Sequence, residues 1–236
     1  MFRVTTKKEY WHYLDAGAAK PNRGTLKDVQ DAFILYALRG VEKKRILELG
    51  GGNSRVLPLL AERNECWNLD KFEGLGGGPI KAQKGRGIRI IREYMGSFSE
   101  ELPSQYFDYV ISISAVEHIH HEFFSASMRD CTRVLKPGGL MFHAIDLYLL
   151  DDIDQHPHGT RQSSRLGLYR SIPEIVEGAC EWIEPPVVDE NVTARASFAV
   201  NSVDELYAWN VSAPALIDVR EIAVSCNLEV GLRKAP

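Results

Sequence analysis

The chain has 236 residues, of which 44% are hydrophobic and 25% are charged, a composition typical of a globular protein. Its net charge of −4 excludes the overall basic field of a dedicated nucleic-acid-binding protein, and no apolar run approaches the roughly 18 residues of a membrane span. Its cysteines form no CxxC pair, so we expect free thiols and a cytoplasmic location; they are Cys66, Cys131, Cys180 and Cys226.

Hydrophobic periodicity and turn residues predict helices that alternate with strands. In the first half we expect two helices within 6–39 separated at 19–24, a strand at 45–50, a helix at 56–62, and strands at 66–70, 88–91 and 107–113. In the second half we expect a helix at 123–134, a turn at 135–139, a strand at 140–145, a short helix at 172–182, and closing strands at 221–225 and 228–232.

Strands that alternate with helices imply βαβ units and a parallel sheet. The predicted fold is therefore α/β and Rossmann-like, with a mostly parallel sheet and helices on both faces. A chain of this length buries a full core without disulfides or metals, and no repeat or linker divides it. We predict a single domain over residues 1–236.

A glycine-rich turn follows the first predicted strand of the sheet and has the sequence Glu48-Leu-Gly50-Gly51-Gly52. Because glycines have no Cβ, the backbone turns sharply there and approaches a ligand closely. Asp70 ends the next strand, 18 residues after Gly52, and an acid at that place suits a bidentate grip on ribose hydroxyls. The pattern predicts a nucleoside-containing cofactor.

Two cofactor classes use a turn of this kind. A dinucleotide enzyme needs a third glycine for close packing of the helix, and this chain has Arg55 there. S-adenosylmethionine (SAM) has no pyrophosphate and needs no such glycine. The chain also contains no G-x-x-x-x-G-K-[ST] phosphate-binding loop. The turn therefore favours SAM over a nicotinamide dinucleotide.

At this turn the sequence resembles the class I SAM-dependent methyltransferases, and among them the type-11 group. The first motif of that group is an acid followed by x-G-x-G-x-G. Glu48, Gly50 and Gly52 match it, and Ser54 replaces the last glycine. Asp70 matches the ribose-binding acid of the second motif.

Further motifs of the same group follow in order. Residues 107–118, FDYVISISAVEH, match F-D-x-V followed by apolar residues and E-H, and residues 133–139, RVLKPGG, match the turn before the fifth strand. The resemblance spans residues 45–146 and implies SAM as cofactor and a seven-stranded, mostly parallel sheet. It divides the domain into N-terminal helices at 1–40, a cofactor-binding half at 41–146, and acceptor-side elements with closing strands at 147–236.

One motif departs from the family pattern. Where the third motif usually has Gly-Asp ahead of Leu-Pro, with the acid near adenine, this chain has Met95-Gly96-Ser97-Phe98. Ser97 offers its hydroxyl and its backbone N–H to the adenine instead. The residues predicted to bind the cofactor are Glu48, Gly50, Gly51, Gly52, Asn53, Ser54, Asp70, Lys71, Ser97, Phe98 and Ser114.

Methyl transfer to a hydroxyl or an amine removes a proton from the acceptor, so a base with a pKa near 7 assists it. Ligands of open α/β sheets lie outside the carboxyl ends of the strands, which places the segments after 107–113 and 140–145 beside the methyl group. The predicted catalytic residues are His118, His143 and Asp146. His118 is either a base or a helix cap, and His143 either forms a base oriented by Asp146 or is a buried core histidine.

Two polar segments suggest further roles. His118, His120 and His121, with the acids and histidines of 151–158, have no recognised ligand spacing, so no metal is predicted. The glycine-rich stretch 73–87 is expected to be a loop at the ligand edge. It is either a lid that attracts an anionic acceptor or a solvated loop, and the cations within and after it are Lys81, Lys84, Arg86, Arg89 and Arg92.

These features predict a SAM-dependent methyltransferase that acts on an oxygen of a small, anionic or sugar-like molecule. The run HAIDL at 143–147 resembles methyltransferases found with bacterial polysaccharide and sugar genes. No N-P-P-[YF] or D-P-P-[YF] motif follows the fourth strand, so a nucleic acid is not an expected partner, and without a long apolar run a membrane is not expected either. A non-catalytic SAM-binding protein and an NAD(P)-dependent oxidoreductase are the alternatives, and the oligomeric state stays open.

Overall fold

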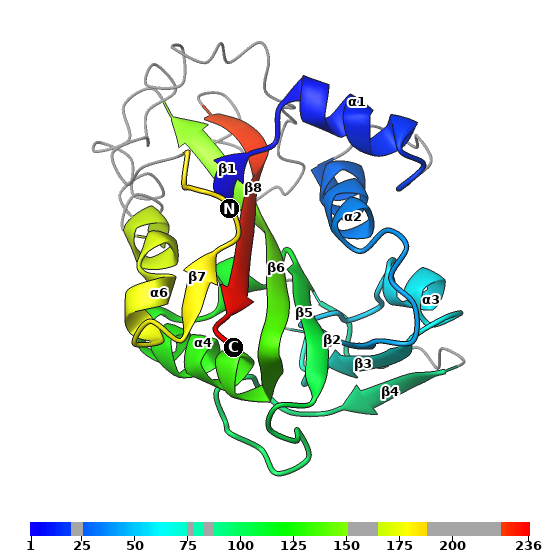
Figure 1. The fold of residues 1–236 in the computed structure, drawn as a ribbon, viewed down its shortest axis with the longest axis vertical. Helices are drawn as coiled ribbons and strands as arrows, with labels where there is room; N and C mark the ends of the chain where they lie inside the picture. Colours follow the sequence, from blue (N-terminus) through cyan, green and yellow to red (C-terminus); the bar gives the residue numbers. More distant parts are fainter. Residues whose placement is uncertain (20–25, 75–77, 83–86, 151–164, 188–222) are drawn as a thin grey trace.

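One mixed sheet forms the centre of the molecule (Figure 1). The computed structural model describes residues 1–19, 26–74, 78–82, 87–150, 165–187 and 223–236. The 8-stranded sheet has the order β1-β8-β6-β5-β2-β3-β4, and β7 also pairs with β8. The strands are β1 (Phe2–Val4), β2 (Arg45–Leu49), β3 (Glu65–Leu69), β4 (Ile88–Ile91), β5 (Phe107–Ile113), β6 (Leu135–Leu150), β7 (Cys180–Trp182) and β8 (Ala223–Lys234).

Five strands adjacent in the sheet run parallel to one another, in the order β6, β5, β2, β3 and β4. Strand β8 runs antiparallel to β6. This arrangement confirms the predicted α/β fold with a mostly parallel sheet. It also places the carboxyl ends of β2 to β6 at one edge of the sheet, where the ligand site of an open α/β sheet lies.

Helices cover both faces of the sheet (Figure 1). Along β6, Phe142 and Ala144 pack with α1, α2 and α3, while Met141 and Ile145 pack with α4 and α6 on the other face. This follows from the alternation of side chains along a strand. The helices are α1 (Lys7–Asp15), α2 (Leu26–Ala37), α3 (Leu57–Leu60), α4 (His121–Val134) and α6 (Ile172–Ile175).

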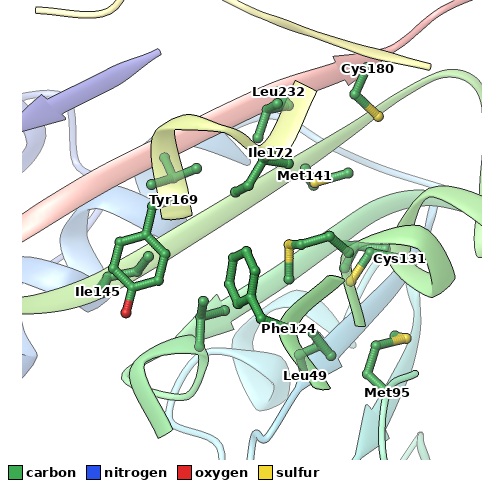
Figure 2. Close-up of a cluster of buried hydrophobic side chains, with 14 of the residues drawn as sticks. Leu49, Met95, Phe124, Cys131, Met141, Ile145, Tyr169, Ile172, Cys180 and Leu232 are labelled. Atoms are coloured by element: carbon green, nitrogen blue, oxygen red, sulfur yellow. The ribbon is translucent and has the colours of Figure 1, made fainter. Parts of the chain in front are cut away.

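Figure 2 shows the buried core on the α4 and α6 face. The rings of Phe124 and Tyr169 lie with centroids 5.7 Å apart, and Ile172 and Met141 belong to the same cluster. Each fully buried apolar side chain of this size contributes roughly 1.5–3 kcal/mol. The cluster fixes α4 against β5 and β6, and so fixes the segment that precedes α4 at the carboxyl edge.

The edge of the sheet beyond β8 differs from the prediction. The sequence predicts seven strands. The structure has eight because the two predicted closing strands fall on the single strand β8, while β1 and β7 are added and pair with successive parts of β8. Phe2 lies opposite Val230, and Cys180 lies opposite Lys234. Each of these edge strands has 3 residues, too few for an alternating pattern to show in the sequence.

The predicted helix at 172–182 is wrong. Helix α6 ends at Ile175, and residues 180–182 form β7. The helix stops because Glu177 and Gly178 adopt φ values of 56° and 75°, and the Gly178 N–H donates to the Pro173 carbonyl at 2.8 Å. Glycine in this left-handed conformation is a common way to end a helix, and the reversal sends the chain back along the sheet edge.

Strands β6 and β8 are longer than predicted, and α3 is shorter than the predicted helix at 56–62. The predicted turn at 135–139 lies within β6, where the register against β5 shifts and Gly138 has a φ of 73°. Residues 223–225 and 228–232 of the predicted closing strands are parts of β8, because β6 pairs with it continuously from Leu140 to Leu150, and residues 221–222 lie outside the described residues.

The loop that follows β4 is held by a buried carboxylate of α4. Asp130 Oδ2 accepts hydrogen bonds from the backbone N–H groups of Gly96 at 2.8 Å and Phe98 at 3.1 Å. Its Oδ1 accepts from Arg133 Nε at 2.8 Å. The Asp130 side chain is fully buried, so this carboxylate determines where the third motif of the sequence lies.

Asp130→Ala is therefore expected to lower the free energy of unfolding by about 2–4 kcal/mol, because it leaves buried N–H groups without an acceptor. Chemical denaturation measures this change. Asp15→Ala, a matched change at an exposed position of α1, is expected to stay within about 0.5 kcal/mol of the wild type. Equal stability of the two variants would contradict the role of Asp130.

Candidate functional site

The glycine turn after β2 lies where side chains have no room. Gly50 and Gly52 have φ values of 58° and 49°, which favour glycine. A Cβ on Gly50 would lie 2.7 Å from the Ala115 Cβ, and one on Gly51 would lie 2.6 Å from Asn68 Oδ1. The turn therefore presents bare backbone at the carboxyl edge, in contact with the segment that follows β5.

Two buried polar side chains lie beneath this turn. Asn68 Nδ2 donates to the Gly52 carbonyl at 2.9 Å, but Asn68 Oδ1 and Glu48 Oε2 have no hydrogen-bond partner among the described residues. Both oxygens lie within 2.9 Å of the point that a Gly51 Cβ would occupy. Burial raises the pKa of Glu48 to about 7, against a smaller lowering by Ser54 and Arg55. Buried acceptors without donors are costly, so this place is suited to a ligand that brings N–H donors.

Asp70 lies at the end of β3 and contacts the same turn. Its Oδ2 accepts from the Gly52 N–H at 2.9 Å, and its Oδ1 accepts from the Phe72 N–H at 2.6 Å. These bonds orient both carboxylate oxygens and leave further lone pairs for the hydroxyls of a ribose. The neighbouring Lys71 turns away toward the end of β4, with its Nζ 3.7 Å from Glu93.

The remainder of the first motif serves the local structure. Ser54 Oγ accepts from the Leu57 N–H at 2.9 Å and so starts α3. Arg55, at the position where a dinucleotide enzyme has its third glycine, forms a bidentate ion pair with Asp31 of α2. Both N···O distances of this pair are 2.7 Å. Asn53 is exposed and also has a partner.

The third motif lies on the loop held by Asp130. Ser97 Oγ donates to the Tyr94 carbonyl at 2.8 Å, so its hydroxyl serves the loop itself. Phe98 is 48% exposed and has a φ of 54°, which turns its ring outward. The arrangement leaves the exposed Phe98 ring and the loop backbone as the groups that this segment offers to an adenine.

On the other side of the turn, the ends of β5 and β6 meet helix α2. Ser114, with a φ of 49°, has its Oγ 2.6 Å from Asp146 Oδ1 and 2.7 Å from Gln30 Oε1. Gln30 Nε2 donates to Asp146 Oδ1 at 2.7 Å. Lys27 Nζ donates to Ser114 Oγ and lies 3.4 Å from Asp146 Oδ1. These four side chains form the acceptor-edge network.

Glu117 contributes a second carboxyl group to this network. Its Oε1 accepts from the Asp146 N–H at 3.4 Å, while its buried Oε2 has no partner among the described residues. Burial, and then the charge of Asp146, raise the pKa of Glu117 well above its ordinary value. Burial alone would also raise the pKa of Asp146, but Lys27 and the bonds from Ser114 and Gln30 lower it. The negative charge of the pair therefore lies on Asp146.

The predicted pairing of His143 with Asp146 is wrong. His143 is fully buried on the α4 face of β6, with its Nδ1 2.8 Å from Ser112 Oγ, whereas Asp146 contacts α2 on the opposite face. Residues three apart on a strand point to opposite faces, so they cannot form a pair. Burial lowers the pKa of His143 to about 4, so the ring is a neutral core histidine.

His118 lies at the end of a short 3-10 helix, Val116–His118, that begins directly after Ala115. Its side chain is exposed and has a partner. Among the described residues, no group of three or more histidines, cysteines or acids is arranged to hold a metal ion. The acids and histidines of 151–158 lie outside the described residues, so the expected lack of a metal stays a prediction.

Two of the cations in and after the stretch 73–87, which is either a lid or a solvated loop, contact aromatic rings nearby. The guanidinium of Arg89 lies 4.0 Å from the ring centroid of Trp67, and that of Arg92 lies 5.0 Å from the ring centroid of Phe72. Lys81 is exposed, and Lys84 and Arg86 lie outside the described residues. The structure instead places Lys27 of α2 at the acceptor edge, and no motif in the sequence indicated this residue.

The residues that sequence reasoning missed are Asn68, Gln30 and Lys27. Asn68 lies on β3, two positions before Asp70, which directly follows this strand. Side chains two positions apart point to the same face, so the sequence could have placed Asn68 near Asp70. Gln30 and Lys27 lie on a helix whose position against β5 and β6 depends on the packing of distant segments. Among the described residues, no helix combines the length and the apolar character that a bilayer crossing requires.

Comparisons with known proteins agree with this geometry. Residues 47–143 match the type-11 family model, which is described as a methyltransferase domain. No curated protein sequence matches the chain. The match includes the turn at 135–139, and it includes the glycine turn, Asp70 and Ser114, which lie at the edge described above.

Several solved structures share the fold. The YcgJ protein from Bacillus subtilis has 13% identity and a TM-score of 0.53, with 86% of this chain and 97% of that chain covered. An arsenic(III) S-adenosylmethionine methyltransferase from Chlamydomonas reinhardtii has 17% identity and a TM-score of 0.50, with 84% and 65% covered. Phosphoethanolamine N-methyltransferase 2 from Haemonchus contortus, solved with SAM, has 16% identity and a TM-score of 0.51, with 86% and 52% covered.

At these identities the solved structures establish the fold, and the family model establishes the motifs. The glycine turn without side chains, the carboxylate of Asp70 and the unpartnered acceptors of Glu48 and Asn68 fit SAM as the cofactor. Residues 47–143 are therefore similar to the methyltransferase domain of the type-11 family model, and the chain shares the fold of these solved structures.

Proposed function

We propose that this chain is a SAM-dependent methyltransferase, that it acts on an oxygen atom of a small-molecule acceptor, and that the acceptor is anionic or sugar-like. One observation carries the proposal: in the acceptor-edge network, Gln30, Ser114 and Asp146 place amide, hydroxyl and carboxylate groups beside the glycine turn. Such groups are suited to hold a polar acceptor, whereas an apolar wall is suited to a hydrophobic one. The anionic character rests on the cations in and after the stretch 73–87, and the sugar-like character rests on the sequence resemblance alone.

The cofactor half of the site follows from the contacts beneath the turn. We assign the ribose hydroxyls to Asp70, whose oxygens are oriented by the Gly52 and Phe72 N–H groups. We assign the ammonium of the cofactor's amino-acid end to the acceptors of Glu48 and Asn68, which have no donor among the described residues. When bound, SAM supplies an electrophilic methyl group on a positively charged sulfur.

The acceptor half divides the remaining work between two residues. Asp146 keeps its negative charge and accepts a hydrogen bond from a second hydroxyl of the acceptor, which orients the reacting hydroxyl toward the methyl group. A carboxylate with a lowered pKa is a weak base, so the proton goes to His118, whose imidazole is exposed just beyond Ser114. A cytoplasmic location remains a prediction from the cysteine pattern.

Binding and turnover measurements test the function. We expect titration calorimetry to show binding of SAM and no binding of NAD. With methyl-labelled SAM, label is expected to move to sugars, uronates or phenols and not to a matched set of amines. Transfer to amines alone would contradict oxygen as the target, and binding without transfer to any member of the panel would favour a non-catalytic SAM-binding protein.

The raised pKa of Glu48 makes SAM binding dependent on pH. A cationic group next to this carboxylate lowers its pKa, so binding below the free value of about 7 must release a proton. The SAM association constant is therefore expected to rise with pH and to level off above that value, with a slope of about one log unit per pH unit. Calorimetry over a pH series measures the slope.

Glu48→Gln is expected to remove this slope of the SAM association constant with pH. The control is Glu65, a partly exposed acid at the start of β3, and Glu65→Gln is expected to retain the slope. A slope unchanged by Glu48→Gln would show that another group carries the proton, and the assignment of the ammonium to Glu48 would then be wrong.

His118 and His121 allow a matched test of the base. Once an acceptor is known, His118→Ala is expected to lower kcat by about a hundredfold or more while the SAM affinity stays unchanged. The exposed His121 begins α4, and His121→Ala is expected to leave kcat within about twofold. Steady-state kinetics and calorimetry provide both values. Full turnover by His118→Ala would exclude it as the base.

A further inference from the structure

We propose that Lys27 of helix α2 binds the α-carboxylate of SAM. The assignment rests on the proposed cofactor site, and it adds a residue from outside the segment that matches the family model, which starts at residue 47. Lys27 would then determine specificity, because its positive charge favours binding of SAM over binding of adenosyl compounds that have no carboxylate.

The order of groups along the carboxyl edge supports this assignment. Asp70 stands at the end of β3, the glycine turn follows β2, and Ser114 and Asp146 stand at the ends of β5 and β6. With the ribose on Asp70 and the adenine toward the loop after β4, the amino-acid end of SAM points the other way. It passes the glycine turn and reaches the edge of β5 and β6, where Lys27 lies.

Contacts of the turn make this path continuous. The Gly50 Cα lies against Ala115, since a Cβ there would come within 2.7 Å of the Ala115 Cβ. Ala115 directly follows Ser114, whose Oγ accepts from Lys27 Nζ. The ammonium of Lys27 therefore contacts Ser114, and the next residue, Ala115, contacts the glycine turn.

The charges along this path match an amino acid with both an ammonium and a carboxylate. Glu48 and Glu117 present buried carboxyl oxygens without donors among the described residues. Lys27 supplies a positive charge beside Asp146 at the same edge. A carboxylate placed among acids alone would be repelled, so recognition of the whole amino acid requires a cation at this point.

Lys27 is positioned by its hydrogen bond to Ser114 Oγ, and its ion pair with Asp146 is looser. Its Nζ lies 3.4 Å from Asp146 Oδ1, whereas Gln30 and Ser114 contact the same oxygen at 2.7 Å and 2.6 Å. The Lys27 side chain is 39% exposed, and exposed ion pairs contribute little to stability. An ammonium also has more N–H donors than these two contacts use. Lys27 is therefore held in place while a donor stays available.

The test compares SAM with decarboxylated SAM, in which a propylamine chain replaces the amino acid, by titration calorimetry. The wild type is expected to bind SAM about tenfold more tightly, the usual effect of a partly exposed charge-assisted hydrogen bond. In Lys27→Met this preference is expected to fall to within about twofold, and in Lys27→Arg to be largely retained. Lys8→Met, the same change at an exposed position of α1, is expected to keep the full preference.

Two further measurements separate direct contact from indirect effects. Loss of any positive charge favours the more cationic decarboxylated ligand at long range, but high salt screens that effect. The change in preference is therefore expected to persist at high ionic strength. Where Lys27→Met fails to fold, Lys27→Gln replaces it, with thermal unfolding confirming the native state.

Three results would overturn the assignment alone: equal loss of both affinities in Lys27→Met, a wild type that does not discriminate, or a preference that changes only at low salt. Equal loss would show that Lys27 only supports Ser114 and Asp146. Absence of binding of both ligands to the wild type would overturn the proposed function and this assignment together.

Discussion

The structure depends on one constraint: a turn without side chains, Gly50 to Gly52, lies directly over two buried polar groups. Asn68 holds the turn through the Gly52 carbonyl, yet the Asn68 and Glu48 oxygens next to Gly51 have no donor among the described residues. A protein core ordinarily satisfies such groups. The molecule therefore carries an unfavourable arrangement that the proposed cofactor would relieve, and this arrangement lies where the parallel strands end.

Helix α2 links this turn to the acceptor side. Asp31 pairs with Arg55 just after the glycine turn, while Gln30 and Lys27 contact Asp146 and Ser114 at the ends of β6 and β5. One helix thus contacts three strand ends, and its apolar face packs on the sheet between them. The cofactor half and the acceptor half are joined through side chains that lie outside the sequence motifs of the family.

The two faces of the sheet have different roles at this edge. The α4 and α6 face is closed by apolar side chains, and the buried His143 with Ser112 lies within it. The α1 to α3 face carries Glu48 and Asp146. The polar groups of the site gather on one face because side chains alternate along each strand, so every second residue lies on the same face of the sheet. His143 is an odd number of residues from Asp146 along β6, so its side chain lies on the other face of the sheet, away from these polar groups.

The sequence alone determined the α/β fold, the glycine turn, the acid Asp70 and the cofactor class, because these depend on local patterns: apolar runs, glycines that permit a sharp turn, and an acid at a strand end. Only the tertiary structure decided the rest. The edge strands β1 and β7, the isolation of His143 and the network of Lys27, Gln30 and Asp146 depend on contacts between segments far apart in the chain. No local pattern encodes those contacts, since packing and register set them after the elements have formed.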